Sequence, residues 1–177
     1  MRLSVGQKVA YPNQGVCLVE EFKDRSMGDG SVSGYRLRLL GDSSTIFVPI
    51  ENTGSVGLRP LISIRECHRL IDKLSENFEP LPGDWKARAR SFAEMLRSGD
   101  IFKAADVLKT LVLLSHEKKL SFREQTLLEK SKHLILSEIV NTLRNGKPFA
   151  EDDVMQRVEA ACLKHGYTEP KAFAAVH

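Results

Sequence analysis

The chain has 177 residues, of which 42% are hydrophobic and 28% charged, and its formal net charge is +3. These values are typical of a soluble protein with one large or two small domains. It holds no run of about 18 apolar residues, and its N-terminus lacks the apolar core of a secretion signal, so neither a membrane span nor export is expected. Three widely spaced cysteines argue against a disulfide framework, and a cytoplasmic protein is therefore predicted.

Residues 1–58 carry the short runs of β-branched and alternating side chains that are typical of strands. Four strands are expected, at residues 8–12, 15–22, 34–40 and 45–50. The segments between the last three, SMGDGSVSG and GDSS, are rich in glycine, serine and aspartate and are predicted to be loops. Short strands with tight turns indicate a small, strongly bent antiparallel sheet or barrel.

After Pro60 the apolar spacing changes to that of helices. Five are expected, over residues 63–75, 84–98, 100–115, 121–142, and from the acids at 151–153 to Gly166. Four starts carry side chains that cap helices: Asp84, Asp100 and the capping boxes Ser63–Glu66 and Ser121–Glu124. The predicted fold class is α+β, a small antiparallel β module followed by a compact all-α bundle of about five helices.

No motif points to catalysis or to a bound cofactor. The chain lacks the phosphate-binding loops GxxxxGK[ST] and GxGxxG, the HExxH zinc motif and the GxSxG elbow. Cys17 lies in an apolar strand and is interpreted as a buried thiol, and Asp152-Asp153 as charge at a helix start. Cys67 and His68 would point about 100° apart on a helix, which disfavours a shared metal ion. We predict that the protein is not an enzyme and holds no metal.

Trp85 is the only tryptophan, and it follows a proline-glycine break. On a helix it falls on one stripe with Ala89, Phe92 and Leu96, which favours a core role for the indole. Its place in the first helical turn also allows the ring to project past the core. Both roles stay open at this point.

Basic residues surround this tryptophan: Lys86 and Arg90 lie on one flank of the same helix, and Arg88 lies on the opposite flank. Residues 84–133 carry eleven Lys and Arg against seven Asp and Glu, so the positive charge is concentrated here. Cations bind phosphates, and an exposed indole can stack on or wedge against an opened base step. The segment therefore also suits nucleic acid.

Taken in order, several segments resemble the bacterial CarD/CdnL transcription regulators. VGQKVAYPNQGVCLVEE (5–21) and VPIEN (48–52) are similar to the family's N-terminal module. The helical part is similar in LRSGD (96–100), AADVLKTL (104–111) and LSFREQTLLEKSKHLILSEI (120–139). The resemblance implies a Tudor-like RNA polymerase-interacting β module at 1–60, shared with the transcription-repair coupling factor, and a helical DNA-binding domain at 61–177.

The resemblance also implies partners and sites. The β module would bind the β subunit of bacterial RNA polymerase through Arg25, with Phe47 in place of a second contacting arginine. Trp85 corresponds to the family's wedge tryptophan, and Arg88 and Arg90, with Lys86 beside them, to its basic DNA contacts.

Such a protein would stabilise the open promoter complex from the minor groove at the upstream edge of the bubble, with little sequence preference. It would be nucleoid-associated, and a monomer would suffice. The alternative is an adaptor that binds polymerase or a repair factor without touching DNA, which Phe47 and the modest net charge favour.

Overall fold

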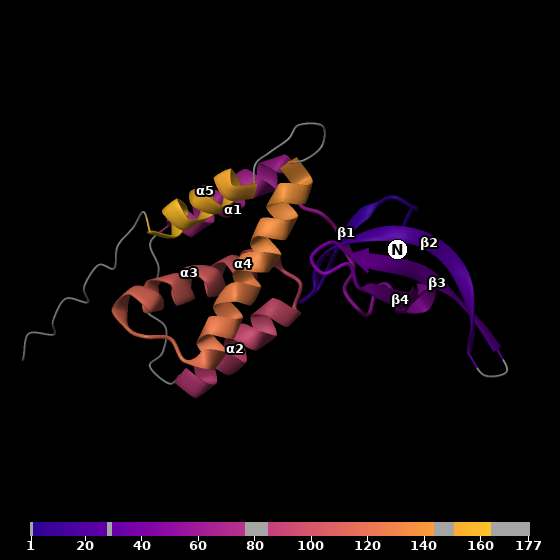
Figure 1. Cartoon of the computed structure of the whole chain (residues 1–177), viewed down its shortest axis with the longest axis horizontal. Coiled ribbons are helices and arrows are strands. Elements are labelled where there is room, and N and C mark those ends of the chain that lie inside the picture. The colour runs from indigo at the N-terminus through magenta and orange to yellow at the C-terminus, as the bar shows by residue number, and fades with distance from the viewer. Residues whose placement is uncertain (1, 28–29, 77–84, 144–150, 164–177) are drawn as a thin grey trace, which may run out of the picture.

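The computed structural model describes residues 2–27, 30–76, 85–143 and 151–163, although the side chains of Met27, Trp85 and Glu151 lie outside this description (Figure 1). Within these ranges the chain forms five strands followed by five helices, which confirms the α+β class and the order of the two modules. The strands are β1 (Lys8–Tyr11), β2 (Gly15–Met27), β3 (Gly30–Leu39), β4 (Thr45–Pro49) and β5 (Arg59–Pro60). The helices are α1 (Ile64–Ser75), α2 (Trp85–Arg97), α3 (Ile101–Glu117), α4 (Phe122–Leu143) and α5 (Glu151–Leu163).

The β module is one antiparallel sheet in the order β4-β3-β2-β1-β5. Alternating side chains of its strands, among them Val9, Val19, Leu37 and Val48, form a buried cluster on one face. A bulge at Glu20 shifts the register between Val19 and Glu21. Because a bulge adds one residue, Glu20 and Glu21 both fall on the opposite face, which we call the outer β face.

Two strand predictions were wrong. The Gly/Ser-rich segment was predicted to be a loop, but its described residues, 26–27 and 30–34, continue the sheet, since β2 runs to Met27 and β3 starts at Gly30, with Arg25 opposite Val32. These residues are mostly exposed, so the ribbon shows no apolar alternation and its backbone pairing leaves no signal in the sequence. β5 was not predicted either, because it is only two residues long and contains a proline, which an edge strand tolerates.

The helix predictions were confirmed within the described residues. Ser63 and Glu66 form the predicted capping box, and the Asp100 side chain accepts a hydrogen bond from the Phe102 amide at 2.9 Å. The predicted cap Asp84 and the predicted end Gly166 lie outside the described residues. None of the described helices is long and apolar enough to cross a membrane.

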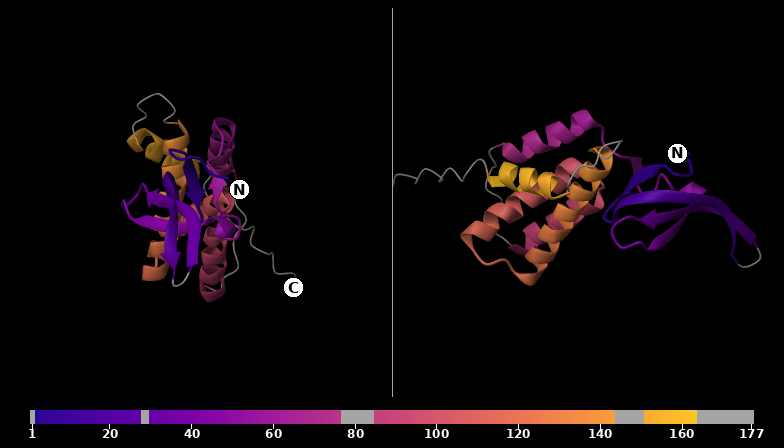
Figure 2. Two further views of the ribbon diagram at one scale, coloured as in Figure 1. Left: turned by 90° about the vertical axis from the view of Figure 1, so that its right-hand side faces the viewer. Right: turned by 45° about the horizontal axis from the view of Figure 1, so that its top comes forward.

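The helical module is arranged around α3 and α4, which pack along each other. α1 and α5 lie together on one side of this pair and α2 lies on the other, as the views in Figures 1 and 2 show. Its core is a second buried cluster, separate from that of the sheet. α4 is the long helix that also contacts strand β2, so it joins the two modules.

Candidate nucleic-acid and partner interface

Helix α2 carries the predicted DNA-binding residues. Ala89, Phe92 and Leu96 are buried, as the predicted stripe requires, and Lys86 and Arg90 are exposed on the other side of the helix. Trp85 is the first residue of α2, so it lies at the start of the helix. Because its side chain lies outside the described residues, the direction of the indole stays a prediction.

Arg88 has a different environment from the other two cations. Its side chain is only 9% exposed, and its Nη2 donates to Oε1 of the buried Glu124, 3.2 Å away on α4. The ion pair therefore fixes the first turn of α2 against the first turn of α4. A DNA contact by Arg88 stays a prediction, and it would compete with this pairing.

Glu124 is the electrostatic centre of this end of the bundle. Burial alone would raise the pKa of its carboxyl, but hydrogen bonds from the Ser121 amide and hydroxyl, then from Arg88, together with the charge of Lys118, lower that pKa to about 2. The predicted capping box is confirmed, since Ser121 Oγ also accepts from the Glu124 amide at 3.3 Å. Glu124 therefore remains ionised and binds both helix starts.

The start of α4 adds a residue that sequence reasoning missed. Phe122 is 86% exposed, more than any other large hydrophobic side chain among those described, and Arg123, Lys118 and Lys119 beside it are exposed too. The sequence held one signal for it, an apolar residue directly after the cap Ser121, where a helix start overhangs the core. The first turns of α2 and α4 lie side by side, away from the sheet (Figure 1), and we call this region the α2–α4 end.

On the outer β face the structure brings together the two predicted polymerase contacts. The Arg25 guanidinium lies over the Phe47 ring, 5.8 Å from its centroid, in a cation–π arrangement. The ring lies over Gly34 of β3, where a Cβ atom would come within 2.7 Å of Phe47 Cζ. Glycine at this position therefore allows the ring to lie against the sheet beside Arg25.

A ladder of charges continues this face. Glu20 pairs with Arg38 at 2.6 Å and with Arg36 at 3.1 Å, and Glu21 pairs with Arg36 at 3.2 Å. A hydrogen bond from Lys23 lowers the pKa of Glu21, and the charge of Arg36 acts in the same direction. Partly exposed pairs of this kind add little stability, but they give the outer β face alternating positive and negative charges.

The cysteines do not form a reactive site. Burial, with a smaller effect of Asp42, raises the pKa of Cys17 to about 12, which confirms the buried thiol and disfavours a nucleophile. Cys67 is buried while His68 is exposed, so the two side chains point apart as predicted. Among the described residues, no three His, Cys, Asp or Glu side chains gather as a metal ion would require.

Comparisons with known proteins agree with the two-module architecture. Residues 3–62 match the family profile described as CarD-like/TRCF RID domain, and residues 69–154 match that of the CarD C-terminal domain. The putative transcription factor YdeB of Bacillus subtilis (strain 168) is 23% identical over 137 residues, which cover 76% of this chain and 88% of that protein. The solution NMR structure of the 72-residue N-terminal domain of Myxococcus xanthus CarD is 30% identical; the match covers 33% of this chain and 79% of that one, with a TM-score of 0.29.

A RID-type β module followed by a CarD-type helical domain defines a transcription regulator associated with RNA polymerase. The chain belongs to the CarD-like family. This is a family of transcription factors that are typically not enzymes.

Proposed function

We propose that this protein binds the β subunit of bacterial RNA polymerase through its outer β face and stabilises the open promoter complex through its α2–α4 end. In this proposal residues 1–60 are the polymerase-binding module and residues 61–177 the DNA-binding domain, which acts in the cytoplasm on the nucleoid. Arg25 and Phe47 contact polymerase, and Trp85 wedges into the minor groove at the upstream edge of the bubble. The observation that carries the proposal is that Trp85 begins a helix whose exposed side is basic.

The energetics favour a tethered mode of action. Few cations are available at the α2–α4 end, so binding to duplex DNA alone would be weak and independent of sequence. Attachment to polymerase raises the local concentration of the helical module at the promoter. Unstacking a base step costs a few kcal/mol, so the indole inserts only where the duplex is already opening, and it shifts the equilibrium by its preference for the open state.

Within this proposal Arg88 positions α2 and Phe122 extends the contact. Arg88 is paired with the buried Glu124, so it holds the first turn of α2, while Lys86 and Arg90 face phosphates. Phe122 presents a second apolar ring beside exposed cations, which is the combination that binds an unpaired strand. A single monomer supplies all of these groups.

Arg25→Glu is expected to weaken polymerase binding by about tenfold, because a charge reversal at a partner contact both loses the cation–π pair and repels the carboxylates that an arginine faces. A pull-down with purified polymerase β subunit measures this. The matched control is Arg65→Glu, an equal reversal at an exposed position on α1, which should bind as the wild type does. Equal binding by both variants would contradict the proposed surface.

Phe122→Ala is expected to lower the fraction of open promoter complexes severalfold, since one base–aromatic stack contributes about 1–3 kcal/mol. The side chain is too exposed to support the fold, so the free energy of unfolding should stay within about 0.5 kcal/mol of wild type. Promoter opening measured with a fluorescent base near the upstream edge of the bubble tests it. Wild-type opening by a folded Phe122→Ala variant would remove Phe122 from the DNA contact.

The second candidate function is an adaptor that binds polymerase or a repair factor and never contacts DNA. Phe47 favours it, because this apolar side chain stands on the outer β face in place of a contacting arginine, and an apolar side chain suits contact with another protein. This candidate predicts that the affinity for the promoter complex is unchanged by substitutions at Trp85 and Arg90 and that it varies little with salt concentration. A salt titration with the Arg90→Ala variant separates the two functions.

A further inference from the structure

Among the described residues, the contacts between the β module and the helical module include three that reach α4 or the turn before α3. The first is an ion pair from Arg59 of β5 to Glu138 of α4. The second packs Pro12, in the turn after β1, against Gly99. The third places His133 of α4 against Gly15, at the start of β2, and against Gly41, in the turn after β3.

The ion pair is bidentate, and its carboxylate is buried. Arg59 Nη2 donates to Glu138 Oε2 at 2.8 Å and Nη1 donates to Oε1, while Nε donates to the Gly99 carbonyl at 2.9 Å. Glu138 Oε1 also accepts from the Ile62 amide at 3.0 Å, in the link between the modules. One arginine therefore connects the last strand of the sheet to two separate elements of the helical module.

Burial makes this pair sensitive to orientation. Glu138 is only 3% exposed, and the hydrogen bonds described for its carboxylate come from Arg59 and from the link at Ile62. If the modules rotated relative to each other, this buried carboxylate would lose its charged partner, which is strongly unfavourable. The bidentate geometry restricts the direction from which the Arg59 guanidinium approaches the carboxylate, and not only the distance between them.

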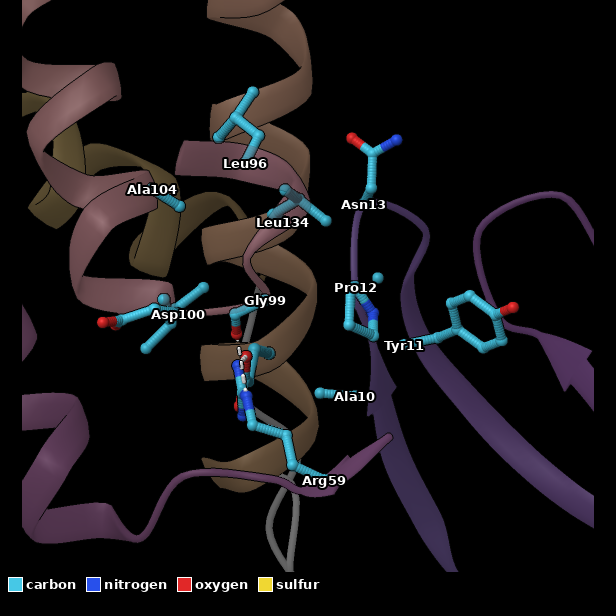
Figure 3. Close-up of a pocket in the computed structure, with 13 residues that line it drawn as sticks. Ala10, Tyr11, Pro12, Asn13, Arg59, Leu96, Gly99, Asp100, Ala104 and Leu134 are labelled. Carbon is cyan, nitrogen blue, oxygen red and sulfur yellow. Dashed lines mark hydrogen bonds and ion pairs between the residues drawn. The ribbon is translucent and has the colours of Figure 1, made fainter. Parts of the chain in front are cut away.

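Close backbone packing supports the pair on either side. Gly99 has φ +74°, and a Cβ atom there would lie 2.8 Å from Pro12 Cγ. A Cβ atom on Gly41 would lie 2.9 Å from His133 Cε1, and one on Gly15 3.1 Å from His133 Nε2. The hollow between the modules, beside Arg59 and Pro12, measures only about 20 Å³ (Figure 3). Three contacts spread over the joint leave little room for rotation.

We infer that Arg59 and Glu138 are positioning residues that hold the outer β face and the α2–α4 end in one fixed orientation. The inference rests on the proposed function, in which one module is anchored to polymerase and the other acts on DNA. A fixed orientation delivers α2 to one place on the promoter and lowers the entropy lost when the second contact forms. The pair thus acts on DNA opening through geometry, without touching polymerase or DNA.

The test separates orientation from folding with two variants of the full chain. Glu138→Gln removes the charge with little change in shape, and the double variant Arg59→Met with Glu138→Leu replaces the pair by apolar side chains, which preserves folding where a lone buried charge would not. Residual dipolar couplings report orientation directly. We expect the wild-type couplings of both modules to fit a single alignment tensor, and those of either variant to require two.

Promoter opening should fall by about tenfold in both variants, with binding to the isolated polymerase β subunit unchanged. A destabilising control is Val158→Ala in the buried face of α5, away from the contacts between the modules, which should keep one tensor and wild-type opening. A single tensor in the double variant, or two tensors with wild-type opening, would overturn the inference; if Glu138→Gln does not fold, the double variant decides. Failure of the proposed function is seen separately, as wild-type opening by Trp85→Ala, and leaves the tensor comparison valid.

Discussion

Replacing Trp85 with alanine is expected to shift the closed-to-open promoter equilibrium toward the closed form by about 1–3 kcal/mol, which lowers the ratio of open to closed complexes by roughly 5- to 150-fold. The loss arises because the indole interacts with an unstacked step and not with intact duplex, so only the open state is destabilised. Binding to the polymerase β subunit should be unchanged, since the outer β face belongs to the other module. The measurement is the yield and lifetime of open complexes formed with purified polymerase.

Two controls make this result specific to the ring. Trp85→Phe retains a flat apolar side chain and should recover part of the opening, whereas Arg97→Ala removes an exposed cation from the far end of α2 and should have little effect. The thermal unfolding midpoint of each variant shows whether the helical module is intact. A folded Trp85→Ala variant that opens promoters as the wild type does would favour the adaptor function.

Glu124→Gln is expected to lower the free energy of unfolding at pH 7 by about 3 kcal/mol, because it removes the buried carboxylate charge that pairs with the mostly buried Arg88. The effect should depend on pH in a defined window. The pKa of Glu124 falls from its ordinary value of 4.5 to about 2 in the folded state, so the carboxylate contributes its full stabilisation above pH 4.5. That contribution is lost as the pH falls through 2, where the folded protein is protonated as well.

Urea unfolding between pH 7 and pH 2 measures this prediction. The difference between wild type and Glu124→Gln should be constant above pH 4.5 and should shrink steadily below it. The matched control is Glu129→Gln, the same substitution at an exposed position of the same helix α4. It should change the free energy of unfolding by less than about 0.5 kcal/mol at every pH. A difference that is independent of pH would contradict the role assigned to the Glu124 carboxylate.

Local signals in the sequence predicted much of this fold. The capping boxes at Ser63 and Ser121 and the cap at Asp100 marked three helix starts, because a cap depends on residues only two or three positions apart. The spacing of Ala89, Phe92 and Leu96 likewise placed the buried side of α2. Helices that begin with a capping side chain, or whose buried residues recur at helical spacing, can therefore be predicted from the local sequence.

Features that depend on distant residues were not predicted. The partner of Arg88 lies 36 residues away, and Arg59 and Glu138 are 79 residues apart, so no local pattern indicates either pair. The long ribbon of β2 and β3 is held by backbone hydrogen bonds between exposed polar residues, which do not alternate in hydrophobicity. The site residues Arg25 and Phe47 were proposed from family resemblance, and their contact became visible only through the sheet register.

The central claim is that the ring at position 85 meets DNA at the upstream edge of the bubble, and site-specific photocrosslinking tests it most directly. A benzophenone amino acid at position 85, in open complexes formed with purified polymerase, is predicted to crosslink to promoter DNA within a base step or two of the upstream edge of the bubble. The same substitution at position 65, on the exposed side of α1, should give no such product. Crosslinks from position 85 that reach only protein, with none to DNA, would contradict the wedge.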